Sequence, residues 1–151
     1  MITLHVRRIA AIAVSVLVLA GCASGVKHKD MSASIATIPA EQGRVYFWRS
    51  AGMFGAAIQP GILLDGKRVG ESQPGGFFYV DAPAGNHEVL MTTEVEKKLT
   101  FTLDKGETKY VKSAVGLGII VYRVYPELAS AEESLKELGD LSYTGNAAAK
   151  R

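Results

Sequence analysis

The stretch Ile62-Leu63-Leu64-Asp65-Gly66-Lys67-Arg68-Val69-Gly70 decides the fold of this chain. An Asp-Gly pair between two short runs is a strong hairpin signal, because both central residues of the tight turn adopt positive φ values that Asp and Gly tolerate. The stretch therefore predicts two antiparallel strands, residues 62–64 and residues 67–70, joined at Asp65-Gly66.

Runs of β-branched and aromatic residues continue on both sides of this hairpin. Most are bounded by Gly, Pro, Ser or Asp, as is typical of strands and turns. Alternation with a period of two is clearest where Leu99, Phe101 and Leu103 alternate with polar residues, which indicates a strand with one buried face. The further strands are expected over residues 44–49, 77–80, 87–94, 99–103, 108–115 and 119–125.

Together these runs predict a mainly β fold, an antiparallel β-sandwich or open barrel of about seven to eight strands. One short C-terminal helix should follow them. Ser130 and Glu133 fit a capping box at its start. Leu135 and Leu138 should share one face, and Gly139 lies where a helix ends on a glycine. A helix of two or three turns is not stable alone, so it must dock on the sheet.

The N-terminal residues have a different character. Arg7-Arg8 precede an eleven-residue run, 9–19, that is apolar except for Ser15. The run ends in Leu19-Ala20-Gly21, directly before Cys22, which is the only cysteine of the chain. A basic start, an apolar run and a small-residue cleavage site are the layout of a secretory signal. The run is too short to span a bilayer as a helix, which needs about 20 apolar residues.

The ending Leu19-Ala20-Gly21-Cys22 resembles the lipobox of bacterial lipoproteins. The resemblance implies that signal peptidase recognises Leu19, Ala20 and Gly21 and cuts before Cys22. It also implies that Cys22 then carries the acyl chains that hold the protein on the membrane. Ala23 is not an acidic retention residue, which by analogy with enterobacterial lipoproteins favours the outer membrane, facing the periplasm. A cleaved signal without acylation and an uncleaved anchor are the alternatives.

The chain is thus expected to have four parts. They are a lipoprotein signal peptide (1–21), the acylated Cys22 with a flexible tether (22–42), a β-sandwich-like domain with the C-terminal helix (43–144) and a disordered tail (145–151). Removal of residues 1–21 takes away Arg7 and Arg8 but no acid, so the 17 Lys and Arg residues fall to 15 and equal the 15 Asp and Glu residues. A chain without net charge and without a basic cluster argues against nucleic-acid binding.

Few side chains of the domain are suited to catalysis. Acylation of Cys22 leaves no thiol, and His87 is the only histidine in the domain, so neither a zinc site of the usual composition nor any other metal site is expected. We interpret His87 as packing beside the preceding turn and donating to a backbone carbonyl. The alternative role is that of a general base in a catalytic triad. Paired carboxylates in a shared cleft would be the other route to hydrolysis.

Residues 50–60 are glycine-punctuated yet apolar, and they fit no strand pattern. Met53, Phe54 and Ile58 are the residues expected to contact a partner if this loop is exposed. In that case it forms an apolar lip for a partner protein, an acyl chain or the membrane surface. The alternative is a loop that folds over one end of the sandwich and covers its core.

Three stretches, residues 63–70, 76–80 and 83–89, together resemble a known group of sequences. They follow the order strand, Asp-Gly turn, strand, Pro-x-Gly-x-His turn, strand. The pattern resembles a group of small bacterial lipoproteins that is defined by a domain of unknown function, over about residues 43–138. Residues 63–89 also resemble the core of the PEGA-type surface repeat, although such a repeat does not contain the apolar loop 50–60. Both resemblances imply a small β module without assigned catalysis, and neither supplies a functional residue beyond Cys22.

The sequence therefore favours a non-enzymatic, lipid-anchored module of the bacterial cell envelope. Its expected partners are the membrane, through the acyl chains on Cys22, and another envelope protein or polymer, with no cofactor. The alternative function is an envelope hydrolase or lipid-handling enzyme that uses carboxylate chemistry. A third interpretation places a small apolar ligand inside the sandwich.

Overall fold

The computed structural model describes residues 21–93, 96–118 and 122–145 of the chain. The strands of this part are β1 (Gln42–Trp48), β2 (Gly61–Leu64), β3 (Lys67–Glu71), β4 (Gly76–Pro83), β5 (Gly85–Thr92), β6 (Glu96–Leu103), β7 (Thr108–Leu117), β8 (Tyr122–Ala129) and β9 (Ser142–Tyr143). The helices are α2 (His28–Met31), the 3-10 turn η1 (Ser32–Ser34) and α3 (Ala131–Leu138).

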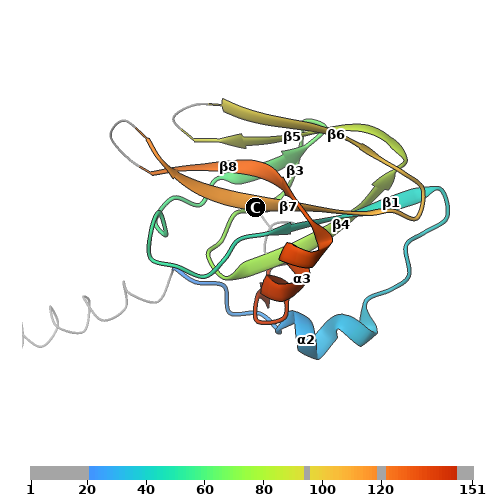
Figure 1. The fold of residues 1–151 in the computed structure, drawn as a ribbon, viewed down its shortest axis with the longest axis horizontal. Coiled ribbons are helices and arrows are strands. Elements are labelled where there is room, and N and C mark those ends of the chain that lie inside the picture. Colours follow the sequence, from blue (N-terminus) through green and yellow to red (C-terminus); the bar gives the residue numbers. More distant parts are fainter. Residues whose placement is uncertain (1–20, 94–95, 119–121, 146–151) are drawn as a thin grey trace, which may run out of the picture.

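The strands form two stacked sheets, with the helices beneath the lower one (Figure 1). The upper sheet has the order β3-β2-β5-β6 and is antiparallel throughout. The lower sheet has the order β8-β7-β1-β4-β9. The mainly β, two-sheet fold with a short C-terminal helix is as predicted. The lower sheet also contains two parallel pairs, β1 with β7 and β4 with β9, which the sequence did not indicate.

The expected hairpin is present as β2 and β3. Asp65 and Gly66 have φ values of 50° and 79°, so both central residues of the turn lie in the left-handed region. This geometry is the reason for the Asp-Gly pair, because a β-branched residue would be strained there. Leu64 pairs with Lys67 across the turn, and a register irregularity follows between Ile62 and Leu63.

The larger core lies between the two sheets. The chain buries alternate residues of its strands here, and Phe47 and Phe78 stack across β1 and β4 with ring centroids 5.0 Å apart. The fully buried members of this core are Val45, Val89, Met91, Leu103, Val111 and Val124. The buried Ser113 is a polar side chain in this layer, and its hydroxyl lies 3.9 Å from Met91 Sδ. Desolvation of the surrounding apolar side chains is the main term that holds the sheets together.

A second core lies on the other face of the lower sheet, toward the helices. Tyr46, Trp48 and Phe77 form it together with Leu138 and Leu141, and Met31 and Ile35 pack against it. The His28 ring lies 5.1 Å from the Phe77 ring, edge to face. β1 is therefore buried on both faces, which explains why it is a continuous rather than an alternating run of large residues.

Residues 22–42 were expected to form a flexible tether, but part of this segment packs against the second core. Residues 27–35 lie against the sheet, and the backbone N–H of His28 donates to Leu141 O at 3.0 Å. The Arg44 guanidinium also donates to Ala36 O at 2.9 Å. The apolar residues Met31 and Ile35 have no regular period, so the sequence gives no sign of a packing partner for them. Their partner is the outer face of β1 and β4, which only the sheet topology creates.

Helix α3 begins and ends where the sequence predicted, but its buried face differs from the one expected. Ser130 Oγ accepts the Glu133 N–H at 3.1 Å, which is the capping contact. Ser134 and Leu138 face the sheet, and Trp48 Nε1 donates to Ser134 Oγ at 3.1 Å. Leu135, expected on the buried face, is exposed instead. Gly139 directly follows the last helical residue, as expected, but with an α-helical φ of −47° and not a left-handed conformation.

The remaining strand boundaries differ little from those expected. β7 continues through Gly116, where a break was expected, and β8 extends to Ala129 through Pro126. Residues 119–121, Glu94, the signal residues 1–20 and the tail residues 146–151 lie outside the described part of the chain. None of the helices that the structure describes is both long and apolar enough to cross a membrane.

Candidate functional site

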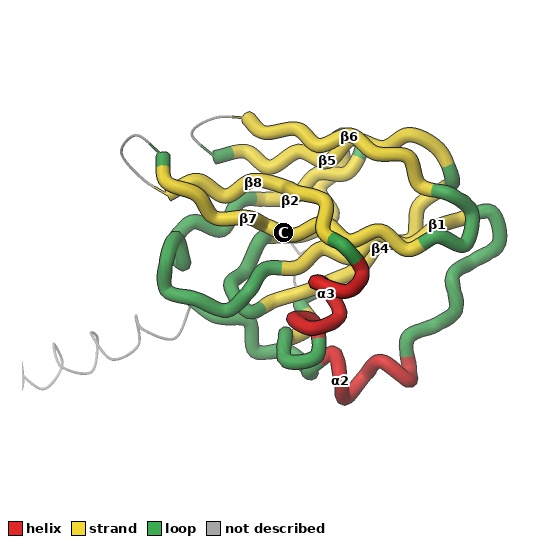
Figure 2. Tube along the Cα trace, viewed as in Figure 1, coloured by secondary structure: helices red, strands yellow, loops and turns green. Residues whose placement is uncertain are grey.

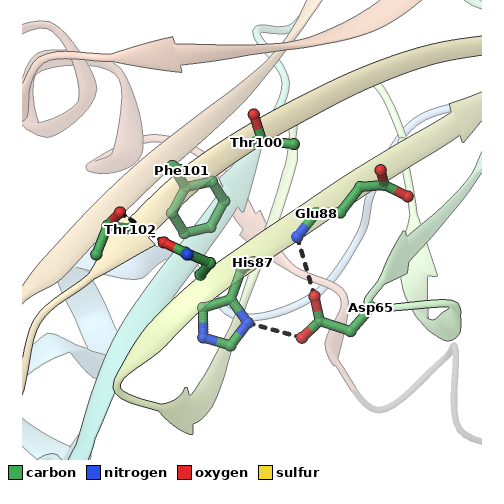
Figure 3. A pocket seen from close by; sticks show the side chains of 7 residues that line it. Asp65, His87, Glu88, Thr100, Phe101 and Thr102 are labelled. Carbon is green, nitrogen blue, oxygen red and sulfur yellow. Dashed lines mark hydrogen bonds and ion pairs between the residues drawn. The ribbon is translucent and has the colours of Figure 1, made fainter.

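Asp65 and His87 lie side by side at one end of the upper sheet (Figure 3). His87 is buried on β5, and its Nδ1 is 2.7 Å from Asp65 Oδ2. Its Nε2 is 2.8 Å from the backbone carbonyl oxygen of Pro83. The other carboxylate oxygen of Asp65 accepts the backbone N–H of Glu88 at 2.9 Å. The expected contact of His87 with a backbone carbonyl is thus present.

The pairing of Asp65 with His87 was not predicted. β2 pairs with β5 so that Leu64 faces Val89, and this register brings the turn residue Asp65 beside His87 and Glu88. The two residues are 22 positions apart, and only the strand order could have shown the contact. Partial desolvation works against ionisation of Asp65, but the Glu88 N–H and His87 outweigh it and lower the pKa of the carboxyl.

A shallow hollow of about 570 Å³ lies next to this pair. Its walls are Asp65, His87 and Phe101 with the polar side chains of Asn86, Glu88, Thr100 and Thr102. Thr102 Oγ1 donates to Asn86 Oδ1 at 2.8 Å, so this hydroxyl is already engaged (Figure 3). A general base needs a ring nitrogen that faces a nucleophile. Both nitrogens of His87 face acceptors of the protein itself, so the pair is built to fix the turn after β2 and the turn before β5.

Of the other described carboxylates, Glu127 and Glu133 line a second hollow of about 310 Å³, where Lys112 Nζ lies 3.8 and 2.8 Å from them. Asp81 forms a two-pronged ion pair with the buried Arg44, with Nε–Oδ1 and Nη2–Oδ2 distances of 2.6 and 2.8 Å. Glu88 pairs with Lys98 and Glu107 with Lys109 on the surface. In the part of the chain that the structure describes, no group of three His, Cys, Asp or Glu residues has the arrangement of a metal site.

Cys22 is exposed, and the residues on either side of it are attached to the folded domain. Gln59 Nε2 donates to the carbonyl oxygen of Gly21 at 3.0 Å. The backbone N–H of Ala23 donates to Pro74 O at 3.1 Å. Leu19 and Ala20 lie outside the described residues. The exposed Cys22 therefore lies at one end of the sandwich, beside the loop of residues 50–60.

The loop of residues 50–60 is held from below by Arg49. This side chain is only 2% exposed, and its guanidinium donates to the carbonyl oxygens of Ile58, Ser72 and Gly55 at 2.7, 3.0 and 2.8 Å. Burial lowers the pKa of Arg49, and the three carbonyls replace the water that it loses. A loop without regular structure thus has a defined shape, because its own carbonyl oxygens satisfy a buried cation.

The two expected roles of this loop belong to different residues. Ile58 is half-buried and packs against the core between the sheets, so it covers one end of the sandwich. Met53 and Phe54 are 90% and 74% exposed. The Phe54 ring lies 5.9 Å from that of Tyr122, at the start of β8. Of the three residues expected to contact a partner, only Met53 and Phe54 are open to one.

Comparison with known proteins identifies the family to which the chain belongs. A model of the family "Protein of unknown function (DUF2846)" matches residues 39–123, which are more than half of the sequence. The chain belongs to the DUF2846 family. This region contains β1 to β7, the Asp65–His87 pair and the loop 50–60. Cys22, α3 and β9 lie outside the part that defines DUF2846.

A relative with a curated sequence is also similar. An "Uncharacterized protein" of Haemophilus influenzae (strain ATCC 51907 / DSM 11121 / KW20 / Rd) is 27% identical over 99 residues. The alignment covers 65% of this DUF2846 chain and 58% of the relative, so the chain spans little more than half the length of that protein. No solved structure matches the chain.

Proposed function

We propose that this DUF2846 protein is a lipid-anchored lipoprotein of the bacterial envelope, held at the outer membrane facing the periplasm. Its β-sandwich is a non-catalytic module that binds another envelope protein or polymer. The observation that carries the proposal is the sequence Leu19-Ala20-Gly21-Cys22 after a basic and apolar start. Exposure of Cys22 supports it, because a lipid-modifying enzyme must reach the sulfur.

An acylated Cys22 would hold the domain on the bilayer for long times. Each buried methylene contributes about 0.8 kcal/mol, and two or more acyl chains make release rare. The short path from Cys22 to the sheet supports a domain that lies close to the membrane, because residues 27–35 pack on the lower sheet instead of extending away.

The contacts of His87 support a role without catalysis. The alternative, a hydrolase with carboxylate chemistry, needs a nucleophile or a second acid near a group that can take a proton. Asp65 and His87 are close enough to act together, but the side-chain contacts described above direct both toward backbone groups. The similarity of residues 63–89 to a PEGA-type core agrees with a binding module and is part of the same proposal.

Labelling with palmitate tests the anchor. The wild-type protein, expressed in a bacterium with lipoprotein processing, should incorporate labelled palmitate, and Cys22→Ser should incorporate none. Ala23→Ser serves as the control for a substitution at the next position. Equal labelling of wild type and Cys22→Ser would rule out Cys22 as the acylated residue.

Crosslinking in intact cells tests the binding role. A photoreactive residue in place of Thr100, on the exposed face of β6, should give a discrete product with an envelope protein or polymer. The same residue in place of Lys105, in the β6–β7 turn, is the matched control on another surface. Absence of any product from Thr100 or from other positions across both sheets would contradict an interaction module.

A further inference from the structure

Three segments of the chain that carry no charge meet at one end of the sandwich. Residues 21–26, 50–60 and, from the described part of the β7–β8 hairpin, 113–118 with Tyr122 contain no Asp, Glu, Lys, Arg or His. Gln59 contacts the first segment at Gly21, and Phe54 contacts the third at Tyr122. In Figure 2 the long loop between β1 and β2 and the ends of β7 and β8 lie together on the left of the molecule. Uncharged segments that are far apart in the sequence thus lie together at this end.

Large apolar side chains at this end point into solvent. Met53 and Phe54 are 90% and 74% exposed, and Leu117 at the end of β7 is 83% exposed. Leu117 is the register partner of Tyr122, which touches Phe54. Gly55 lets the loop approach β7 closely, because a Cβ there would lie 3.0 Å from Val115 Cγ1 and its φ is +66°. We call Met53, Phe54 and Leu117, with Tyr122 between them, the apolar tip.

The opposite end of the sandwich has a different composition. The turns that meet there carry Glu41, Lys105 and Glu107, and Glu41 and Lys105 form an exposed ion pair. On the side of the apolar tip, the exposed charges of β6 are Glu96, Lys97 and Lys98. They belong to the upper sheet, whereas Cys22 lies beside the lower one. Nearer to Cys22, Ser50 Oγ donates to the exposed Glu137 at 3.1 Å, and Arg123 follows Tyr122 on β8. Charged side chains therefore border the apolar tip but are not among its members.

The geometry points to the apolar tip as a membrane-contacting surface that inserts into the same bilayer that holds the acyl chains of Cys22. The inference rests on the proposed lipid anchor and adds the orientation of the domain. Acyl chains on Cys22 would keep the surface beside it at the membrane–water interface. The apolar tip would then already lie next to the bilayer. Insertion of uncharged, apolar and aromatic side chains into the interface is favourable, whereas inserted charges would oppose it.

The stiffness of the tip supports contact with lipid. Arg49 fixes the carbonyl oxygens of Gly55 and Ile58, so Met53 and Phe54 are held outward before they meet a membrane. Ordering of the loop therefore costs little on binding. A protein partner on this surface would have to share the narrow space between the domain and the bilayer, which makes lipid the better occupant.

Fluorescence quenching by brominated lipid tests the inference with the protein isolated from membranes. Phe54→Trp and Leu117→Trp each place an indole on the tip, and Leu135→Trp places one at an exposed apolar position on α3. Trp48 is buried and gives the background in the wild type. In vesicles of phosphatidylethanolamine and phosphatidylglycerol with brominated acyl chains, the emission at positions 54 and 117 should be quenched severalfold more than at position 135. The same two indoles should emit at shorter wavelength than the control.

The outcomes separate the inference from the proposed anchor. The intact mass of each protein shows whether Cys22 carries acyl chains. A mass without acyl chains would overturn the proposed anchor, whatever the quenching shows. Quenching at position 54 no greater than at position 135 would overturn the membrane-contacting tip, even in a fully acylated protein. Quenching at 54 but not at 117 would overturn the combined surface. A photoreactive residue at position 54 that crosslinks to a protein instead of lipid in cells would do the same.

Discussion

Single residues of this protein act mainly by fixing turns. Asp65 adopts a positive φ in the β2–β3 turn, accepts the Glu88 N–H and contacts the His87 ring. One side chain thus connects two turns that are distant in the sequence. Arg49 likewise connects two loops, because its guanidinium donates to three of their carbonyl groups. These contacts replace regular hydrogen bonding where the chain leaves the sheets.

Asp65→Ala should lower the free energy of unfolding by about 1–2 kcal/mol, because it leaves the Glu88 N–H and a nitrogen of His87 without their acceptor. Asp65→Asn should cost less, since an amide oxygen still accepts from Glu88 and Asn tolerates the left-handed conformation. Urea unfolding at pH 7 measures both. Equal stability of the Ala variant and the wild type would contradict the role of the pair.

The pH dependence of Asp65 follows from the direction of its pKa shift. The folded state lowers the pKa of Asp65, so the stabilisation is complete above the unfolded value of about 3.9 and is lost as the pH falls through the folded value. The difference in unfolding free energy between wild type and Asp65→Asn should therefore shrink between pH 7 and pH 3. A difference that grows on acidification would show that the sign is wrong.

Elements of the fold are stabilised by the layer against which they pack. α3 has only eight residues, and it is held by Leu138 and Ser134 on the outer face of the lower sheet. Its capping contact fixes where it begins, but burial decides which side faces the sheet. Pro126 in the edge strand β8 lacks an N–H, which limits the addition of a further strand to that edge.

Truncation of two leucines on α3 should separate these effects. Leu138 is 1% exposed, so Leu138→Ala should lower the free energy of unfolding by about 2–5 kcal/mol. Leu135 is 56% exposed, so Leu135→Ala should change it by less than about 0.5 kcal/mol. Chemical unfolding of the two variants is a matched comparison on one helix. Similar losses would mean that α3 docks through another face.

At the scale of the whole molecule, the protein has three layers and two cores. The upper and lower sheets enclose the first core, and the helices with residues 27–35 enclose the second. The domain therefore begins before Gly43, where the change in composition had placed its boundary. The N-terminal segment is structural, and it also carries Cys22 close to the sheet.

Replacement of residues 27–38 by a Gly/Ser segment of equal length tests this boundary. The change keeps the length of the chain but removes Met31 and Ile35 from the second core. With about 1.5–3 kcal/mol for each fully buried large side chain, these half-buried residues should together give a loss of about 2 kcal/mol. The loss is measured by urea unfolding against the wild type. Unchanged stability would show that this segment is a flexible tether and does not stabilise the domain.

The sequence by itself determined the elements that depend on neighbouring residues. Asp65-Gly66 specified a hairpin, alternation specified strands, and Ser130 with Glu133 specified the start of a helix. These patterns work because backbone geometry and local hydrogen bonds involve residues a few positions apart. The family also follows from the sequence alone, and Leu19 to Cys22 suggested the anchor without any structure.

Only the tertiary structure decided which of these elements meet. Three features each join segments that are distant in the sequence: the parallel pairing of β1 with β7, the contact of His87 with Asp65 and the apolar tip around Phe54. Such contacts depend on the order of strands and on burial, which no local pattern records. For the same reason the loop 50–60 could be given two roles in advance but not divided between Ile58 and Phe54. Burial is a property of the assembled layers, and it appears only when both sheets are in place.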